Sequence, residues 1–86
     1  MDGLDGNAMA GALFSVFGGE MTPATGVCAH CGATRPVAEV RVYMRGPGIV
    51  ARCRSCDGIL LVLVEIRGVT CVDLRGLSAL DPPPRA

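Results

Sequence analysis

The sequence predicts a small β-rich α+β domain in which a short N-terminal helix precedes two antiparallel β-hairpins. Three observations lead to this fold class: two CxxC motifs, alternating apolar residues after position 37, and apolar residues at helical spacing before position 18. The chain has 86 residues, which suffices for one domain but not for a large core. Aromatic residues make up only 3% of it, so the core must be mainly aliphatic.

The helix is expected over residues 5–17. Asp5 or Asn7 can cap its N-terminus, and Gly18–Gly19 ends it. Glycines inside the segment lower its intrinsic stability, so it needs a surface to pack on. That surface is either the chain's own sheet, which is the default expectation, or a partner. The apolar face consists of Met9, Leu13, Val16 and Phe17, and Phe14 widens it. Residues 20–27 are expected to form an extended connection.

The first hairpin is expected between residues 37 and 52. Its first strand has the period of two that is typical of a half-buried strand. One side carries Val40, Val42 and Met44, and the other carries Glu39, Arg41 and Tyr43. Arg45–Gly48 has the composition of a turn, and Ile49–Arg52 forms the return strand.

The second hairpin is expected to begin with Ile59–Ile66, a segment that is apolar at nearly every position. Arg67–Gly68 makes a tight reversal into Val69–Leu74. Leu77–Leu80 reads as a short docking turn, and Pro82–Pro84 as a disordered or extended tail.

The cysteines predict a metal site that joins these hairpins. Two CxxC pairs lie 21 residues apart, a spacing typical of a tetrahedral Cys₄ site for Zn²⁺. Binding of Zn²⁺ contributes about 10–16 kcal/mol in small peptides, against about 3–5 kcal/mol from a core of this size. Each CxxC motif is expected to form a tight turn, called a knuckle below. We expect Gly32 and Gly58 to supply the positive φ that these two knuckles need. The predicted metal ligands are Cys28, Cys31, Cys53 and Cys56.

Knuckles and hairpins in this order define a zinc ribbon. The expected organisation is an N-terminal helix and connection over residues 1–25, a Cys₄ zinc-ribbon domain over 26–75, and a C-terminal tail over 76–86. A Cys₄ shell leaves no open position for a substrate, and the sequence has no HExxH motif, so the expected role of Zn²⁺ is structural and no enzymatic activity is predicted.

Other interpretations of the cysteines fit the sequence less well. A disulfide framework is disfavoured because there are five cysteines and because Met1–Asp5 is acidic, unlike an export signal. Redox catalysis would need the first CxxC at the start of a helix, which Gly32–Pro36 cannot form. His30 should face solvent, although it remains an alternative ligand. The fifth cysteine, Cys71, is expected to be a small buried or half-buried hydrophobe.

A cytoplasmic location is expected, because thiolates on a metal suit a reducing compartment. The longest apolar run, Ile59–Val64, is too short to span a membrane.

Charge and hydropathy give two alternatives for the partner. Eight arginines balance eight acids, and half of the residues are hydrophobic. That apolar fraction favours an interface with another protein or a second copy of this chain. The alternative is a nucleic-acid-associated ribbon, although lysine is absent and Tyr43 is the only aromatic residue nearby. The arginines that would serve it are Arg41, Arg45, Arg52 and Arg54, and Arg35 precedes them.

Six segments spread along the chain form one further pattern: Asp5–Ala8, Ala10–Gly11, Met21–Ala24, Cys28–Gly32, Pro47–Cys56 and Asp73–Gly76. Taken together, they resemble a family of small actinobacterial zinc-ribbon proteins of unknown function. The resemblance extends from about residue 3 to residue 77. Such membership implies a zinc ribbon and supplies no activity. The family commonly has an aromatic residue near the position of Cys71, where this sequence departs from the pattern.

Overall fold

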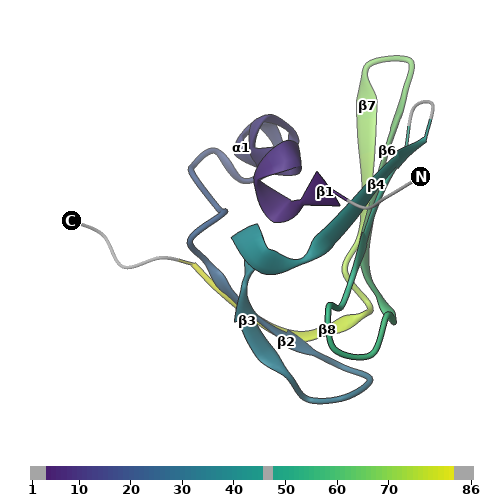
Figure 1. Ribbon diagram of the computed structural model, residues 1–86. Coiled ribbons are helices and arrows are strands. Elements are labelled where there is room, and N and C mark those ends of the chain that lie inside the picture. The colour runs from purple at the N-terminus through teal and green to yellow at the C-terminus, as the bar shows by residue number, and fades with distance from the viewer. Residues whose placement is uncertain (1–3, 46–47, 83–86) are drawn as a thin grey trace.

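The computed structural model describes residues 4–45 and 48–82, which form an antiparallel β domain with one α-helix (Figure 1). Its elements in chain order are β1 (Leu4–Asp5), η1 (Gly6–Met9), α1 (Ala10–Phe17), β2 (Thr25–Cys28), β3 (Thr34–Pro36), η2 (Val37–Glu39), β4 (Arg41–Arg45), β5 (Gly48–Arg52), β6 (Ile59–Ile66), β7 (Val69–Asp73) and β8 (Leu77–Asp81), where η marks a 3₁₀-helix.

The strands form two antiparallel sheets. The larger has the order β1-β4-β5-β6-β7, and the smaller has the order β3-β2-β8. Both predicted hairpins, β4–β5 and β6–β7, lie side by side in the larger sheet. The predicted fold class, a small β-rich domain with an N-terminal helix, is therefore confirmed.

The core lies between the larger sheet and the helical segment beside it (Figure 1). Val42, Ala51 and Leu61 are direct neighbours across β4, β5 and β6, and they are 0%, 0% and 4% exposed. Met9 and Leu13 belong to the same cluster, each 1% exposed. The period-two pattern thus places one face of the sheet in the core, and the helical segment covers it within the same chain.

The N-terminal segment differs from the single helix expected over residues 5–17. Residues 6–9 form a 3₁₀ turn, which Asp5 caps by accepting a hydrogen bond from the N–H of Asn7 (3.1 Å). The α-helix ends at Gly18 as expected, with φ +74°. Its buried face is narrower than expected, because Phe17 is 39% exposed. Two turns of helix present only a narrow stripe to the sheet.

The smaller sheet was not expected from the sequence. The chain over Thr25–Cys28 is a strand, and Leu77–Leu80, expected as a docking turn, lies in β8. Gly26 pairs with Leu80 on one side and with Arg35 on the other. Short strands with weak intrinsic preference form here because tertiary pairing overrides local propensity.

Residues 37–39 also differ, because they form a 3₁₀ turn and the predicted strand starts later, at Arg41. The centre of the Arg45–Gly48 turn and most of the Pro82–Pro84 tail lie outside the described residues. Across residues 4–45 and 48–82, no helix has the length and apolar character needed to cross a membrane.

Candidate metal centre

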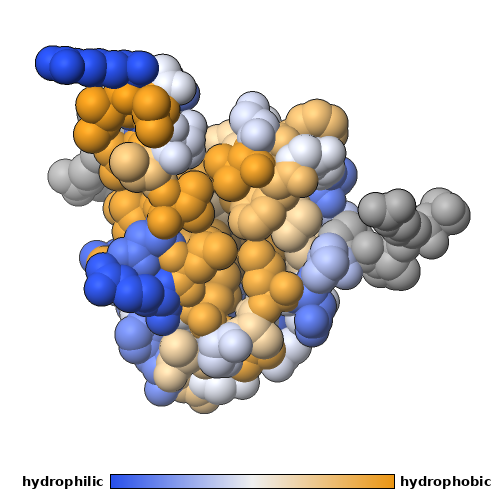
Figure 2. Space-filling view, turned by 180° about the vertical axis from the view of Figure 1, so that it is seen from behind, coloured by the Kyte–Doolittle hydropathy of each residue, from blue (hydrophilic) through white to orange (hydrophobic). Residues whose placement is uncertain are grey.

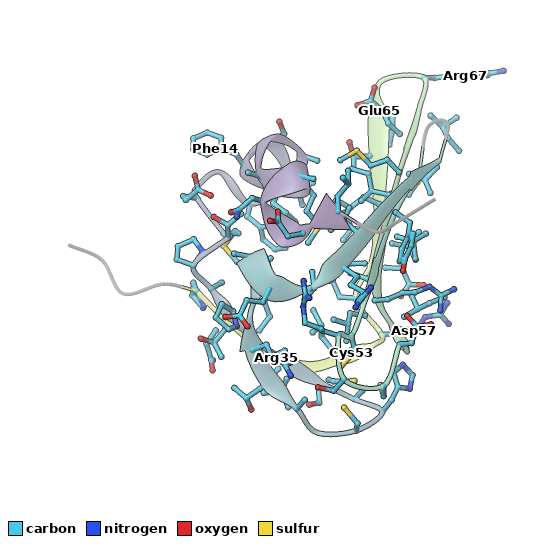
Figure 3. All side chains as sticks on the ribbon, in the orientation of Figure 1. Phe14, Arg35, Cys53, Asp57, Glu65 and Arg67 are labelled. Atoms are coloured by element: carbon cyan, nitrogen blue, oxygen red, sulfur yellow. The ribbon has the colours of Figure 1, made fainter. Side chains whose placement is uncertain are left out.

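The four predicted ligands converge where the two sheets meet. Cys28 ends β2 and Cys31 lies in the β2–β3 turn, whereas Cys53 directly follows β5 and Cys56 lies in the connection to β6. Their sulfur atoms all lie within 4.8 Å of one another. Figure 3 shows the position of Cys53 at the lower end of the domain. Each CxxC pair thus contributes one buried cysteine at or directly after the end of a strand and one exposed cysteine in the adjoining turn.

The sulfur separations suit a tetrahedral ion. A regular tetrahedron with Zn–S bonds of about 2.3 Å has edges of about 3.8 Å. The Sγ atoms of Cys28 and Cys56 are 3.7 Å apart, and so are those of Cys31 and Cys53. Each of these distances is between a sulfur of the first CxxC pair and a sulfur of the second. The donor set, four soft thiolates, is one that Zn²⁺ prefers in closed structural sites.

The first knuckle is a tight backbone turn around Cys28. The N–H of Cys28 donates to the carbonyl of Ala33, and the N–H of Gly32 donates to the carbonyl of Cys28, both at 2.9 Å. The N–H of His30 points at the sulfur of Cys28 (3.3 Å). Gly32 has φ +77°, as the sequence predicts. Amides aimed at a sulfur stabilise its thiolate form, which is the form that binds metal.

The second knuckle repeats this geometry. The N–H of Cys53 donates to Gly58, and the N–H of Asp57 donates to Cys53, both at 2.8 Å. The sulfurs of Cys53 and Cys56 accept N–H groups from Ser55 and Gly58, each at 3.4 Å. Equivalent amides therefore serve both halves of the site.

Glycine plays a different part in the second knuckle from the one predicted. The residue with positive φ is Asp57 (φ +61°), which occupies the position equivalent to Gly32. Gly58 is needed for space instead, because a β-carbon there would lie 2.5 Å from Cδ2 of His30. The prediction that Gly58 supplies a positive φ was therefore wrong. Residue 58 is constrained to glycine because the ring of His30, from the first knuckle, leaves no room for a side chain.

His30 is exposed as predicted, but its ring is held in place. Its Nε2 lies 3.0 Å from the carbonyl oxygen of Ile59 and donates to it, because a carbonyl can only accept. The cluster of ligand atoms that can surround one ion contains the four cysteines and not His30. His30 therefore connects the first knuckle to the start of β6.

The chain between β7 and β8 passes through the same corner. The N–H of Ala29 donates to the carbonyl of Gly76 (2.9 Å). A β-carbon at Gly76 would collide with the carbonyl oxygen of Ile59 and lie 2.6 Å from the α-carbon of Leu60. Only glycine fits at this crossing of three backbone segments.

A bulge in the sheet fills the space beneath the cysteines. The β5–β6 register shifts between Ala51 and Arg52, leaving Leu60 without a cross-strand partner on β5. Leu60 and Leu61 are consequently both buried, at 4% exposure each. Leu60 lines a small cavity together with Cys28 and Cys53. The bulge thus gives the site an apolar floor.

The thiols differ in acidity without a metal. Burial raises the pKa of Cys53, but the N–H groups of Cys56 and Ser55 and the adjacent thiols outweigh it and lower the pKa to about 6. The N–H of Gly58 lowers the pKa of Cys56, but burial and the three other cysteines outweigh it and raise the pKa to about 12. Four thiolates at such distances repel one another, so full ionisation requires a cation.

Three of the arginines support the second knuckle. Arg35 donates to Oγ of Ser55 (3.0 Å), and Arg52 donates to the carbonyl of Asp57 (2.9 Å). Arg54 donates to the carbonyl of Glu39 (2.8 Å). Sequence analysis missed this role, because neither a backbone carbonyl nor a serine hydroxyl distant in the sequence leaves a trace in the residue pattern. Arg35 and Cys53 line the same small cavity, and Figure 3 labels both at this end of the domain.

Cys71 lies apart from the cluster, on β7, and is exposed. The expectation of a buried or half-buried side chain was wrong. Cys71 pairs with Val64 on the face of the larger sheet opposite the core. Within the described residues that face has no helix over it (Figure 1).

Fold and site together define a class: a small antiparallel β domain whose two sheets meet at a four-cysteine cluster suited to a metal ion. The chain belongs to a family of unknown function (DUF6510), whose model matches residues 1–85. Comparisons with curated proteins and with solved structures gave no match.

Proposed function

We propose that this protein is a non-enzymatic interaction module whose fold depends on a structural Zn²⁺ bound by its four clustered cysteines. The observation that carries the proposal is the convergence of four sulfurs within 4.8 Å of one another, from two turns that adjoin strands of different sheets. A metal ion bound there joins the two sheets through four metal–sulfur bonds. The ligands are Cys28, Cys31, Cys53 and Cys56.

The chemistry of the site supports a structural role. Four thiolates fill the tetrahedral shell of Zn²⁺, whereas a catalytic zinc keeps one position for water or substrate. Binding is worth about 10–16 kcal/mol in small zinc domains, which exceeds the whole stability of many proteins of this size. The metal is therefore expected to decide whether the domain folds.

The exposed apolar surface supports a binding role. Figure 2 shows hydrophobic surface running down the middle of one side of the molecule. Apolar patches of this kind on small domains mark interaction sites. The large hydrophobic residues that are exposed are Leu4, Phe14, Phe17, Met44, Ile59, Ile66, Val69 and Val72.

Metal analysis of the protein purified under reducing conditions tests the first part. We expect one Zn²⁺ per chain, with four sulfurs at about 2.3 Å in X-ray absorption spectra. Cys53→Ser should lose the metal and unfold, and Cys71→Ser is the matched control that should keep both metal and fold. A nitrogen in the first shell would implicate His30. A folded, metal-free Cys53→Ser protein would contradict the structural role.

A second candidate is binding to single-stranded nucleic acid. Arg41 and Arg52 are direct neighbours on β4 and β5, and Tyr43 lies two residues from Arg41 on the same face. Cations beside an aromatic ring suit phosphates and stacked bases. Titration of a labelled oligonucleotide at several salt concentrations tests this: Arg41→Gln should reduce the salt slope, because each neutralised phosphate releases counterions. No binding at low salt would remove this candidate.

A further inference from the structure

The four sulfurs of the metal centre differ in how easily a reagent can approach them. Cys28 and Cys53 are each only 3% exposed. Cys31 and Cys56 lie in the two turns and are exposed. A thiolate reacts as a nucleophile only where a reagent can reach its sulfur atom. Chemistry on this cluster therefore begins at Cys31 or at Cys56.

Hydrogen bonds to sulfur distinguish the two exposed cysteines. The sulfur of Cys56 accepts the N–H of Gly58 at 3.4 Å. The two buried sulfurs also accept one backbone N–H each, at 3.3 Å and 3.4 Å. Across residues 4–45 and 48–82, no N–H group donates to the sulfur of Cys31. An N–H group stabilises negative charge on a sulfur, and this stabilisation is lost as the sulfur forms a new bond. The Cys31 thiolate is thus the more nucleophilic of the two.

The ring of His30 adds to this difference. A β-carbon on Gly58 would lie 2.5 Å from Cδ2 of His30 and 3.3 Å from the sulfur of Cys56. The ring and this sulfur are therefore neighbours. The hydrogen bond between His30 and the carbonyl of Ile59 (3.0 Å) keeps the ring in this position. One side of the Cys56 sulfur is consequently occupied by the imidazole.

We propose that Cys31 is a modification site for hydroperoxides, and that its oxidation ends in a disulfide with Cys53 that releases the metal ion. The Sγ atoms of Cys31 and Cys53 are 3.7 Å apart, and a disulfide bond is about 2.05 Å long, so the two sulfurs have only a short distance to close. A hydroperoxide is small enough to reach an exposed sulfur without a binding pocket. The inference rests on the proposed structural Zn²⁺ and adds a reaction at the same site.

The reaction has two balanced steps. First, the Cys31 thiolate attacks the terminal oxygen of the hydroperoxide ROOH. An S–O bond forms, the O–O bond breaks, and the alkoxide takes a proton to become ROH, leaving a sulfenic acid on Cys31. Second, the Cys53 thiolate attacks that sulfur. An S–S bond forms, the S–O bond breaks, and hydroxide takes a proton to become water. The two thiolates together lose the two electrons that ROOH gains. Each chain reacts once, so the process is a modification and not catalysis.

This oxidation removes two of the four metal ligands. Cys28 and Cys56 alone cannot fill the tetrahedral shell of Zn²⁺, so the ion should leave. Cys31 lies in the β2–β3 turn and Cys53 follows β5, so the new disulfide still joins the two knuckles. We therefore expect loss of the metal without complete unfolding. Reduction in the presence of Zn²⁺ should restore the original site.

Alkylation of the zinc-loaded protein tests which thiolate reacts first. A Cys71→Ser background removes the exposed thiol that lies outside the site. With limiting iodoacetamide, mass spectrometry should find Cys31 modified about threefold or more faster than Cys56, a factor that corresponds to the net worth of one hydrogen bond. Cys56 is the matched residue, because it is exposed and holds the same position in its own CxxC motif.

Hydrogen peroxide tests the oxidation itself in the same background. One equivalent should release Zn²⁺ to a colorimetric chelator and produce the Cys31–Cys53 disulfide in an unreduced peptide map. Cys31→His keeps a side chain that can bind zinc but cannot form a sulfenic acid, so release should slow about tenfold or more. The matched control Cys56→His should release zinc as fast as its parent. Should either histidine variant fail to bind zinc, the alkylation order and the disulfide map of the parent protein decide.

Three results overturn this inference and leave the structural metal untouched: alkylation that starts at Cys56, zinc that peroxide does not release, or a disulfide that does not join Cys31 to Cys53. Equal slowing of zinc release in the two histidine variants overturns it too. A protein that never holds zinc contradicts the proposed function itself, which metal analysis shows before any peroxide is added. The two proposals therefore fail by different measurements.

Discussion

The imidazole of His30 occupies the space where a side chain at residue 58 would begin. A β-carbon on Gly58 would lie 2.5 Å from Cδ2 and 3.0 Å from Cγ of the ring. His30 lies in the first knuckle and Gly58 ends the second. The hydrogen bond from His30 to Ile59 keeps the ring there. The two metal-binding turns are therefore packed against each other as well as being positioned to share an ion.

Gly58→Ala should destabilise the domain by about 1–3 kcal/mol, because the ring must move and lose its hydrogen bond. The measurement is denaturant unfolding of the zinc-loaded protein. His30→Ala alone should cost less, and adding it to Gly58→Ala should recover part of the loss, since the clash then disappears. Strictly additive effects of the two changes would show that the ring does not constrain residue 58.

Gly76→Ala should be more damaging than Gly58→Ala. The atoms that an added β-carbon would meet belong to the backbone of Ile59 and Leu60, which cannot rotate away as a side chain can. We expect a loss of about 3 kcal/mol or more, seen in unfolding experiments and in weaker zinc retention.

The control for Gly76→Ala is Gly11→Ala, in α1, where an added β-carbon has nothing within 4 Å. That change should stabilise the protein by about 0.5–1 kcal/mol through helix propensity. If both substitutions changed the free energy of unfolding equally, the backbone segments would not be packed around Gly76 as closely as described.

Much of the larger sheet and of the site could be predicted from local patterns. The alternation in Arg41–Arg45 and the apolar run of Ile59–Ile66 mark strands, and CxxC spacing marks the ligands. The smaller sheet could not be predicted in this way. Thr25–Cys28 and Leu77–Asp81 pair across about fifty residues of chain. Neither has a strong strand pattern of its own, so only the folded context places them together.

The errors at Gly58 and Cys71 have physical reasons of the same kind. Sequence reasoning assigns positive φ to glycine, but Asp57 adopts it, since aspartate also tolerates this region. Alternation along Val69–Asp73 establishes which residues share a face. It does not establish whether anything covers that face, and the single helix covers the opposite one. Both outcomes depend on contacts between segments distant in sequence.

The ion pair between Asp73 and Arg75 predicts a pH dependence. The guanidinium, 2.7 Å away, and the N–H of Arg75 lower the pKa of Asp73 from 3.8 to about 2. Because the folded pKa lies below the ordinary value, the stabilisation is present above about pH 4 and is lost as the pH falls toward 2. The contribution is small, because the pair is exposed.

Comparing the stability of Asp73→Asn with that of the native protein tests this dependence. The difference between the two should stay constant from pH 7 to pH 5 and shrink only below about pH 4. Zinc ligands are the same in both proteins, so their titration cancels in the difference. A difference that stays constant from pH 7 down to pH 2 would mean that folding does not lower the pKa of Asp73. Arg75→Gln should reproduce the pattern.

Leu13→Ala should show that α1 belongs to the core of this chain. Leu13 is 1% exposed and shares the buried cluster with Met9 and Val42, so truncation leaves a cavity and should cost about 2–5 kcal/mol. Phe14→Ala, one residue along, removes a larger side chain that is 54% exposed and points away from the sheet in Figure 3. It should change the free energy of unfolding by no more than about 0.5 kcal/mol. Denaturant unfolding of the zinc-loaded variants gives both values. If Phe14→Ala proved the more destabilising of the two, the helix would have to pack through its other face.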